Sequence, residues 1–314
     1  MAVNWGFLGA GFVASRGLAP AVHASRGAHL YAVASRDEQR SATLEPERVH
    51  ASYDDLLGDE RVDAVYISLS NSQHLQWVTK SLEAGKHVLC EKPLGLSAVE
   101  TEAMFDAAAD NGRLLVEAVW GRWHPRFARM VELVTSGAIG NVEHIETAFT
   151  FTSEMTDNYR LNPAMGGGAL LDVGCYQAHA WVALTQGAPD LAITHVDRTV
   201  GPTGIDLTTD VSVAINNTIT AHAVSSFALP SHQQFIVRGT HGQISTADGE
   251  AFTTWNETSS LLVNGVSEDF PVTNAFVDMV ESVSEAIGGG NGWIVSRADS
   301  IRVAAILDAI GQHP

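Results

Sequence analysis

At 314 residues, 45% of them hydrophobic and 17% charged, the chain has a globular composition and a length that predicts two domains, each with its own core. The formal net charge of −18 argues against nucleic acids and anionic membranes as partners, because both are bound by clustered Lys and Arg. No secretion signal precedes the first strand and no apolar run reaches the length of a membrane span, so a cytoplasmic protein is expected.

The first 120 residues alternate short apolar strands with helical segments. A strand at 3–8 is followed by Gly9-Ala10-Gly11-Phe12-Val13-Ala14 and then by a helix to about residue 25. This G-x-G-x-x-A pattern stands between a strand and a helix, where glycines let the pyrophosphate of a dinucleotide approach a helix N-terminus. Further strands are predicted at 30–34, 62–68, 87–90 and 114–116, and helices from 37 and at 53–57, 72–84 and 97–111. Repeated βα units of this length predict a doubly wound parallel sheet.

The end of the second strand bears on the choice of cofactor. An acidic residue about 20 positions past the glycine loop binds the ribose of NAD, whereas an Arg accommodates the 2′-phosphate of NADP. Here the strand ends in Ser35 and Arg36, which favours NADP. Asp37 follows one position later and keeps NAD open, and Arg36 can also be interpreted as a solvated residue at a helix start.

Two loops leave the carboxyl ends of later strands, which is where ligands bind in open α/β sheets. One is Ser70-Asn71-Ser72-Gln73-His74, in which Asn71 is also explained as a helix N-cap and His74 as a surface histidine. The other is Glu91-Lys92-Pro93. Because Lys92 is one of only three lysines in the chain, its place at the mouth of the sheet favours a functional role.

From about residue 122 the pattern changes. A helix at 125–136 precedes a strand at 142–151, and a helix follows a glycine stretch to about residue 184. Further strands are predicted at 192–199, 209–215, 218–226, 234–238, 243–246, 251–255 and 260–263, and helices at 274–287 and 297–310. Consecutive short strands joined by turns predict a large, predominantly antiparallel open sheet in an α+β domain. Helices on one face would leave the other face apolar, which predicts a homodimer or homotetramer through this sheet.

The chain is therefore divided into a dinucleotide-binding Rossmann domain, 1–121, and a substrate-binding and oligomerisation domain, 122–314. Cys90 and Cys175 show no metal-ligand spacing, so free core thiols and no metal site are expected.

The stretch from Gly166 to Tyr176 combines three consecutive glycines with a carboxylate and a phenol. On a helix, Asp172 and Tyr176 are one turn apart and project from the same face. The segment alone is equally well explained as a glycine-capped core helix with a tyrosine in its packing.

Three motifs together resemble the Gfo/Idh/MocA oxidoreductase family over nearly the whole chain. They are the G-x-G-x-x-A pattern, Ala84-Gly85-Lys86-His87-Val88-Leu89-Cys90-Glu91-Lys92-Pro93, and Gly166-Gly167-Gly168-Ala169-Leu170-Leu171-Asp172-Val173-Gly174. The inositol dehydrogenase branch has His where this chain has Tyr176, and a second Asp at the position of His179. The chain is more similar to the branch with glucose-fructose oxidoreductase, NADP-linked D-xylose dehydrogenase and dimeric dihydrodiol dehydrogenase.

The resemblance implies roles for residues at matching positions. Lys92 would contact the substrate and the nicotinamide ribose and precede a cis peptide bond to Pro93. Asn71 and His74 would lie beside that ribose, and Trp120 and Arg122 would border the nicotinamide. The candidate cofactor-binding residues are Gly9, Gly11, Phe12, Val13, Ser35, Arg36, Ser70, Asn71, His74, Glu91, Lys92, Trp120 and Arg122.

The expected mechanism uses Tyr176 as the acid/base, since a nearby ammonium favours the phenolate. Lys92 would lower the pKa of Tyr176 and orient the substrate oxygen, and Asp172 would hold Lys92 or a sugar hydroxyl. His179 is an alternative base. Candidate substrate contacts are Arg160, His179 and Trp120, and His124 is a further candidate for the pocket lining.

The expected activity is NADP-dependent oxidation of a pyranose, such as D-xylose or D-glucose, at C1, with NAD or a related polyol also open. Alternatives are turnover of trans-dihydrodiols or dicarbonyls, sugar–sugar exchange with retained cofactor, and a non-catalytic dinucleotide-binding regulator of a sugar pathway. Retention of Lys92, Asp172 and Tyr176 argues against the regulator.

Overall fold

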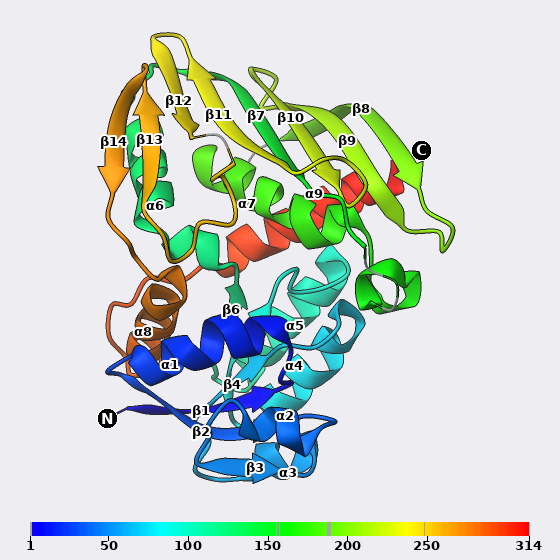
Figure 1. Cartoon of the computed structure of the whole chain (residues 1–314), viewed down its shortest axis with the longest axis vertical. Coiled ribbons are helices and arrows are strands. Elements are labelled where there is room, and N and C mark those ends of the chain that lie inside the picture. The colour runs from blue at the N-terminus through cyan, green and yellow to red at the C-terminus, as the bar shows by residue number, and fades with distance from the viewer. Residues whose placement is uncertain (1, 155, 157, 187–189, 248, 314) are drawn as a thin grey trace. The chain divides into compact units, whose positions relative to one another are not determined.

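The computed structural model describes residues 2–154, 156, 158–186, 190–247 and 249–313 (Figure 1). The chain separates into two compact units. Unit 1 comprises 1–95, 99–120 and 274–297, and unit 2 comprises 96–98, 121–273 and 298–314. By packing, the segment 274–297 therefore belongs with unit 1, although the predicted domain boundary assigns it to the second domain. The division into domains of function at 121/122 stays a prediction.

Unit 1 is built on a six-stranded sheet in the order β3-β2-β1-β4-β5-β6, and every pairing in it is parallel. The strands are β1 (Val3–Leu8), β2 (Ala28–Ala34), β3 (Arg48–His50), β4 (Ala64–Ile67), β5 (His87–Glu91) and β6 (Leu115–Ala118). The predicted doubly wound parallel sheet is thus confirmed. The edge strand β3 was not predicted, because its three residues, Arg-Val-His, contain no apolar run and none of them is buried.

The helices of unit 1 follow the predicted order, and all but the last lie between strands of this sheet. They are a π-helical turn at Ala14–Leu18 that continues into α1 (Ala19–Ala24), then α2 (Glu38–Ala42), α3 (Tyr53–Leu57), α4 (His74–Glu83), α5 (Ala98–Asp110) and α8 (Ala275–Ile287). Side-chain caps define several starts: Asp37 accepts the N–H of Arg40 before α2, and Ser52 accepts that of Asp55 before α3. Phe276 of α8 packs against Gly17, where a Cβ atom would lie 2.9 Å from the ring.

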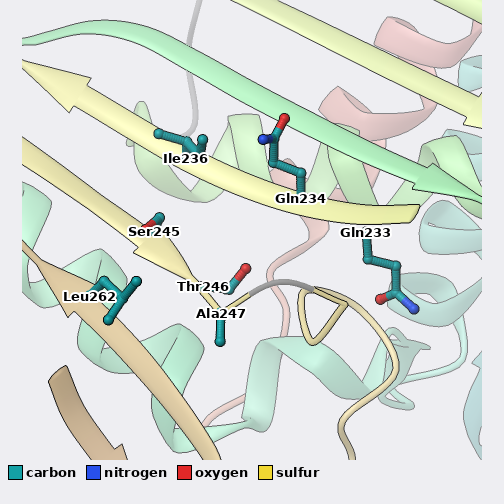
Figure 2. A pocket seen from close by; sticks show the side chains of 7 residues that line it. All are labelled: Gln233, Gln234, Ile236, Ser245, Thr246, Ala247 and Leu262. Atoms are coloured by element: carbon teal, nitrogen blue, oxygen red, sulfur yellow. The ribbon is translucent and has the colours of Figure 1, made fainter. Parts of the chain in front are cut away.

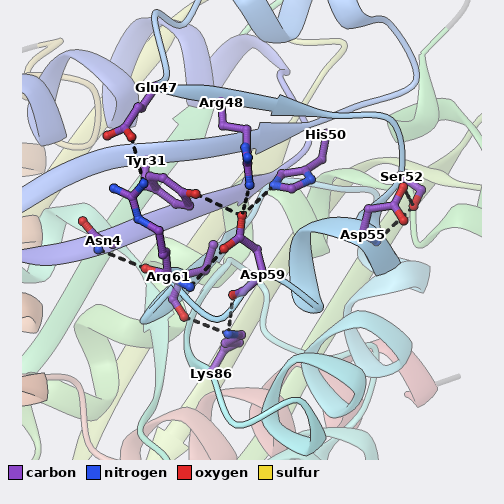
Figure 3. Close-up of polar contacts among 11 residues, drawn as sticks. Asn4, Tyr31, Glu47, Arg48, His50, Ser52, Asp55, Asp59, Arg61 and Lys86 are labelled. Atoms are coloured by element: carbon purple, nitrogen blue, oxygen red, sulfur yellow. Dashed lines mark hydrogen bonds and ion pairs between the residues drawn. The ribbon is translucent and has the colours of Figure 1, made fainter.

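A charged cluster ties the edge strand β3 to the sheet (Figure 3). The Asp59 carboxylate accepts hydrogen bonds from Tyr31 at 3.0 Å, Arg48 at 2.9 Å and the backbone N–H of Arg61 at 3.0 Å, and lies 3.2 Å from His50. Burial alone would raise the pKa of Asp59, but the Arg61 N–H and the Arg48 guanidinium lower it to about 2. The cluster replaces the apolar contacts that this edge strand lacks.

Unit 2 is built on an eight-stranded sheet in the order β14-β13-β12-β11-β7-β10-β9-β8. The strands are β7 (Val142–Thr150), β8 (Leu191–Val200), β9 (Asp206–Ile215), β10 (Ile219–Ser226), β11 (His232–Gly239), β12 (Gly242–Thr246), β13 (Ser259–Val263) and β14 (Val266–Phe270). Only the pairing of β7 with β10 is parallel. The predicted large, mostly antiparallel sheet is confirmed.

Two details of unit 2 differ from the prediction. Strand β14 was not predicted, and the predicted strand 251–255 is wrong, since these residues form turns. Side chains rather than a neighbouring strand bind this backbone: Arg126 donates to the carbonyls of Glu250 and Ala251, and Gln233 accepts the N–H of Phe252. The apolar residues of 251–255 therefore belong to a turn that packs inward and not to a strand.

One face of this sheet packs against α6 (Pro125–Thr135), α7 (Cys175–Leu184) and α9 (Arg297–Gln312) to form the core of unit 2 (Figure 1). Among the described residues, no helix covers the other face. That outer face was predicted to be apolar, which is wrong at its centre. There Glu146 lies 2.9 Å from His144 and 2.7 Å from His222, and His222 lies 2.8 Å from Asp210.

Within the part of the chain that the structure describes, no helix combines the length and the apolar character needed to cross a membrane. Cys90 and Cys175 are both buried free thiols, as predicted.

Candidate active site

The glycine loop after β1 has the shape that a dinucleotide requires. Gly9 has φ of +102°, and a Cβ atom there would lie 2.5 Å from the carbonyl oxygen of Ser68. Gly11 follows at the start of the helical segment, and Val13 opens the π-helical turn. Phe12 is 77% exposed beside this loop. A cradle that only glycine tolerates, next to a helix start, fits the pyrophosphate of a bound dinucleotide.

The short helix after β2 carries an arginine that the sequence did not single out. Arg40 of α2 reaches back and donates to the carbonyl of Ala10 in the glycine loop at 3.0 Å. It lies four residues after the exposed Arg36, which precedes Asp37, the N-cap of α2. No local pattern identifies it, because this hydrogen bond joins residues 30 positions apart.

Asp37 and Ser35 have structural partners in the same loop. The Asp37 carboxylate caps α2 by accepting the Arg40 N–H at 3.1 Å. The Ser35 hydroxyl donates to the Asp37 carbonyl at 2.7 Å and accepts from Ser41 at 2.8 Å. One oxygen of the Asp37 carboxylate, Oδ1, is therefore used as a helix cap.

The turn that holds Lys92 is anchored by three neighbouring elements of unit 1. Tyr66 of β4 donates to the Glu91 carboxylate at 2.6 Å, and His74 of α4 lies 3.0 Å from the Pro93 carbonyl. The Leu94 N–H donates to Glu117 of β6 at 3.0 Å. The peptide bond between Lys92 and Pro93 is cis, as predicted.

Two expectations about the preceding loop are wrong. Asn71 is not an N-cap, because it lies inside a 3₁₀ turn whose cap position is Ser70, and Ser70 donates to Gln73 at 3.1 Å. His74 is not a surface residue, since it is fully buried at the start of α4. Burial lowers the pKa of His74, so the neutral imidazole donates from Nδ1 to Pro93. Contact of Ser70, Asn71 and His74 with a cofactor stays a prediction.

The segment after β6 is largely held by packing and ion pairs. Trp120 is 9% exposed, with its ring 5.7 Å from that of Phe276. Arg122 donates to Asp299 at 2.9 Å. His124 caps α6 by accepting the Arg126 N–H, and burial with the nearby Arg126 charge lowers its pKa to about 4. His124 is therefore a neutral cap, whereas the cofactor roles of Trp120 and Arg122 remain predictions.

In unit 2 the glycine stretch folds against the loop before it. Gly166 and Gly168 have φ of +74° and +117°. The N–H groups of Gly167 and Gly168 donate to the carbonyls of Asn162 and Arg160 at 3.0 and 2.9 Å. A Cβ atom on Gly168 would clash with the carboxylate of Asp206, which accepts the Leu170 N–H at 2.7 Å. The conformation of these glycines thus has a local cause, because it lets the half-buried Asp206 carboxylate bind the start of the helix.

That helix begins with a π-helical turn, Leu170–Gly174, and continues as α7, so Asp172 and Tyr176 belong to one helical stretch as predicted. Asp172 is 8% exposed and accepts from Arg160 Nε at 2.8 Å. Burial alone would lower the pKa of Arg160, but the Asp172 carboxylate and the Tyr159 and Tyr176 phenols raise it. A fixed guanidinium, a carboxylate and a phenol therefore gather on unit 2 itself.

The ring of Tyr176 is half-buried and packs among aromatic side chains. Its centroid lies 5.9 Å from that of Phe149 and 6.3 Å from that of Phe252. His179, the alternative base, is 1% exposed within helix α7. Of the two candidates, only Tyr176 has a ring that reaches the surface of unit 2.

A hollow of 210 Å³ lies on the sheet of unit 2 (Figure 2). Gln234, Ile236 and Ser245 point to one side of the sheet, and Gln233 points to the opposite side of β11. Gln234 pairs with Ala148 and Gln233 with Phe149, and Phe149 contacts Tyr176. The hollow therefore opens mainly on the face opposite to Tyr176. No group of three or more His, Cys, Asp or Glu side chains among the described residues is arranged to hold a metal ion.

Comparisons with known proteins agree with the fold and the glycine loop. A family model described as an oxidoreductase family with an NAD-binding Rossmann fold matches residues 3–118, and the Gfo/Idh/MocA C-terminal domain model matches residues 127–245. D-xylose 1-dehydrogenase (NADP(+)) 2 of Haloferax volcanii is 35% identical, over 98% of this chain and 95% of that protein.

Two further relatives span the whole chain. Trans-1,2-dihydrobenzene-1,2-diol dehydrogenase of Xenopus laevis is 28% identical, over 98% of this chain and 97% of that protein. The crystal structure of KijD10, a 3-ketoreductase from Actinomadura kijaniata in complex with NADP and TDP-benzene, superposes with a TM-score of 0.91 at 25% identity. The superposition covers 99% of this chain and 97% of that one.

Proposed function

The chain belongs to the Gfo/Idh/MocA family of NAD(P)-dependent oxidoreductases, and on that premise we propose that it is an NADP-dependent dehydrogenase that oxidises a pyranose, such as D-xylose or D-glucose, at C1. The observation that carries the proposal is the Asp172–Arg160 ion pair one helical turn from Tyr176, in a chain 35% identical to a xylose dehydrogenase. The pair holds a guanidinium close to the Tyr176 phenol, and a phenol whose phenolate is favoured by a cation can take the proton of a sugar hydroxyl.

Arg36 and Arg40 support NADP over NAD. A 2′-phosphate carries about two negative charges and forms charge-assisted hydrogen bonds with guanidinium groups. Asp37, which could otherwise accept from an unmodified ribose, is engaged as the cap of α2. Gly9, Gly11 and the exposed Phe12 would hold the pyrophosphate and border the cofactor, with Val13, Ser35, Ser70, Asn71 and Glu91 lining the same end of the sheet.

In this proposal four side chains have separate roles in the oxidation of the sugar. When bound, the nicotinamide supplies the hydride acceptor. Tyr176 takes the proton of the C1 hydroxyl, and the Arg160 guanidinium favours its phenolate because an adjacent cation lowers the pKa of a phenol. Lys92 donates to the substrate oxygen and holds it for the transfer. Asp172 keeps Arg160 in place and accepts from a second sugar hydroxyl.

A second substrate class has its own support. Phe149 and Phe252 flank Tyr176, and apolar rings suit the hydrocarbon face of a cyclic trans-dihydrodiol as well as the C–H face of a sugar. A relative of the full chain length is named as a trans-dihydrodiol dehydrogenase. We therefore keep dihydrodiol oxidation as the alternative.

One experiment separates these activities. The rates of NADP and NAD reduction are measured over a panel of aldoses, polyols and trans-dihydrodiols, with Tyr176→Phe as the inactive control. We expect the highest kcat/KM for an aldopyranose with NADP. A higher value for a dihydrodiol selects the alternative, and tight NADP binding without turnover of any compound would instead identify a regulator.

We also propose that the chain forms a homodimer or homotetramer through the outer face of the unit 2 sheet. The support is a broad face that no described helix covers and that carries paired acidic and histidine side chains, Glu146 with His222 among them. Light scattering after size exclusion is expected to give at least twice the monomer mass of 33.5 kDa. A particle of monomer mass contradicts the proposal.

A further inference from the structure

Glu117 carries a carboxyl group in the protein interior, where removing such a group from water is unfavourable in free energy. It lies on the central part of β6, is 1% exposed, and pairs across the sheet with Cys90 of β5. A buried carboxylate is retained only where hydrogen bonds compensate for the lost water. Its Oε1 accepts the N–H of Leu94 at 3.0 Å. Leu94 is the second residue after Lys92, so this hydrogen bond acts directly on the turn that presents the lysine.

The same turn needs such an anchor because of its sequence. Pro93 has no N–H and cannot bind the chain through one. Its carbonyl is held by His74 at 3.0 Å, and the residue before Lys92 is held through Tyr66 and the Glu91 carboxylate. Glu117 supplies the fixed point on the C-terminal side, because its Oε1 accepts the N–H of the residue that follows Pro93.

We propose that Glu117 is a positioning residue that fixes the Lys92 turn by holding the Leu94 N–H, and so sets where the Lys92 ammonium meets the substrate. The role of Lys92 itself rests on the proposed function. Glu117 touches neither substrate nor cofactor in this scheme. Its loss therefore lowers kcat and leaves the KM for NADP almost unchanged, because a small displacement of a positioned group costs up to about 10²-fold in rate.

A change in the position of the Lys92 side chain can be measured directly, because the chain has only three lysines, at 80, 86 and 92. Reductive methylation with ¹³C gives one NMR signal for each, and Lys92→Arg assigns the signal of Lys92. Glu117→Met fills the same volume without an acceptor, and Glu117→Gln keeps a weaker neutral acceptor. Lys80 and Lys86 act as internal controls because they contact Asp54 and the Asp59 and Val62 carbonyls instead.

We expect the Lys92 signal to shift or split in Glu117→Met, to be intermediate in Glu117→Gln, and the two control signals to stay in place. In turnover assays kcat is expected to fall by about 10–100-fold for Met and several-fold for Gln. A folded Met variant with wild-type Lys92 signal and kcat overturns the proposal. If the Met variant does not fold, the same two readouts of the Gln variant decide, and wild-type values overturn it.

The lysine spectrum also separates this proposal from the proposed function. A chain that turns over no substrate still reports through the Lys92 signal whether Glu117 holds the turn. A displaced signal then supports positioning by Glu117 while the dehydrogenase assignment fails, and an unmoved signal rejects positioning whatever the activity.

Discussion

The Lys92 turn of unit 1 and the helix start that carries Asp172 in unit 2 both depend on a carboxylate that accepts a backbone N–H. In unit 1 Glu117 accepts from Leu94, and in unit 2 Asp206 accepts from Leu170. The surroundings differ. Glu117 lies on a parallel strand next to the turn it holds, whereas Asp206 reaches the helix only because Gly168 leaves room for it.

The difference shows two ways of placing a reactive side chain. The Lys92 turn follows a parallel strand, and the sheet fixes where that strand ends. Side chains from β4, α4 and β6 are then enough to hold the turn. A helix start above an antiparallel sheet has no such frame, and the chain uses glycines with positive φ and the Arg160–Asp172 ion pair instead. Unit 1 fixes the backbone around Lys92, and unit 2 fixes charges around Tyr176.

Replacing the phenol tests the role of unit 2 most strongly. Tyr176→Phe is expected to lower kcat by about 10²–10⁴-fold, because the acid/base is lost while the ring still packs on Phe149 and Phe252. Steady-state kinetics with NADP give the number. Tyr31→Phe, which removes a phenol in unit 1 that binds Asp59, serves as the matched control and should keep kcat. Near-normal turnover of Tyr176→Phe would move the acid/base role to Lys92 or His179.

Removing a guanidinium tests the cofactor end of unit 1. Arg40→Met is expected to lower kcat/KM for NADP relative to NAD by about 10–150-fold, since a hydrogen bond to a charged group contributes about 1.5–3 kcal/mol. The comparison of both cofactors with one substrate measures it. The exposed Arg26→Met is the control, and an unchanged preference would leave the 2′-phosphate to Arg36 alone.

The pH profile tests which cation acts on Tyr176. Without the Arg160 guanidinium the phenolate loses a nearby positive charge, so the pKa of Tyr176 rises and the rate of oxidation reaches its plateau at higher pH. For Arg160→Met we expect this limb of the kcat/KM profile to move up by about one pH unit. Arg129→Met removes a partly exposed ion-pair residue of α6 and should not move this limb. An unmoved limb in Arg160→Met assigns the effect to Lys92.

The smallest effect is expected where unit 1 holds its edge strand. The pKa of Asp59 is lowered in the folded state to about 2, so its stabilisation is present above about pH 4 and is lost as the pH falls toward 2. Asp59→Asn should therefore cost about 1–2 kcal/mol at pH 7 after solvent screening, and little at pH 2. Urea unfolding at several pH values measures this, and a pH-independent difference would contradict the charge argument.

Most strands and helices of unit 1 can be predicted from the sequence, because the local sequence signals agree there with the tertiary structure. Apolar runs of strand length, the glycine loop and the helix caps each act over a few residues. The strand β3 was not predicted because the Asp59 cluster, which stabilises it, includes residues distant in sequence such as Tyr31. Residues 251–255 were predicted as a strand because of their apolar side chains. They form a turn instead, because the side chains of Arg126 and Gln233 bind the backbone there.

The sequence by itself determined the two sheets, the dinucleotide loop, the cis bond before Pro93 and the pairing of Asp172 with Tyr176 on one helix, because each follows from spacing along the chain or from a motif. Only the tertiary structure decided that Arg40 reaches the glycine loop, that Arg160 is the partner of Asp172, and that Glu117 and Asp206 anchor the segments that carry Lys92 and Asp172. These contacts join residues 12 to 36 positions apart, and no local pattern records which side chain a fold brings to which backbone N–H.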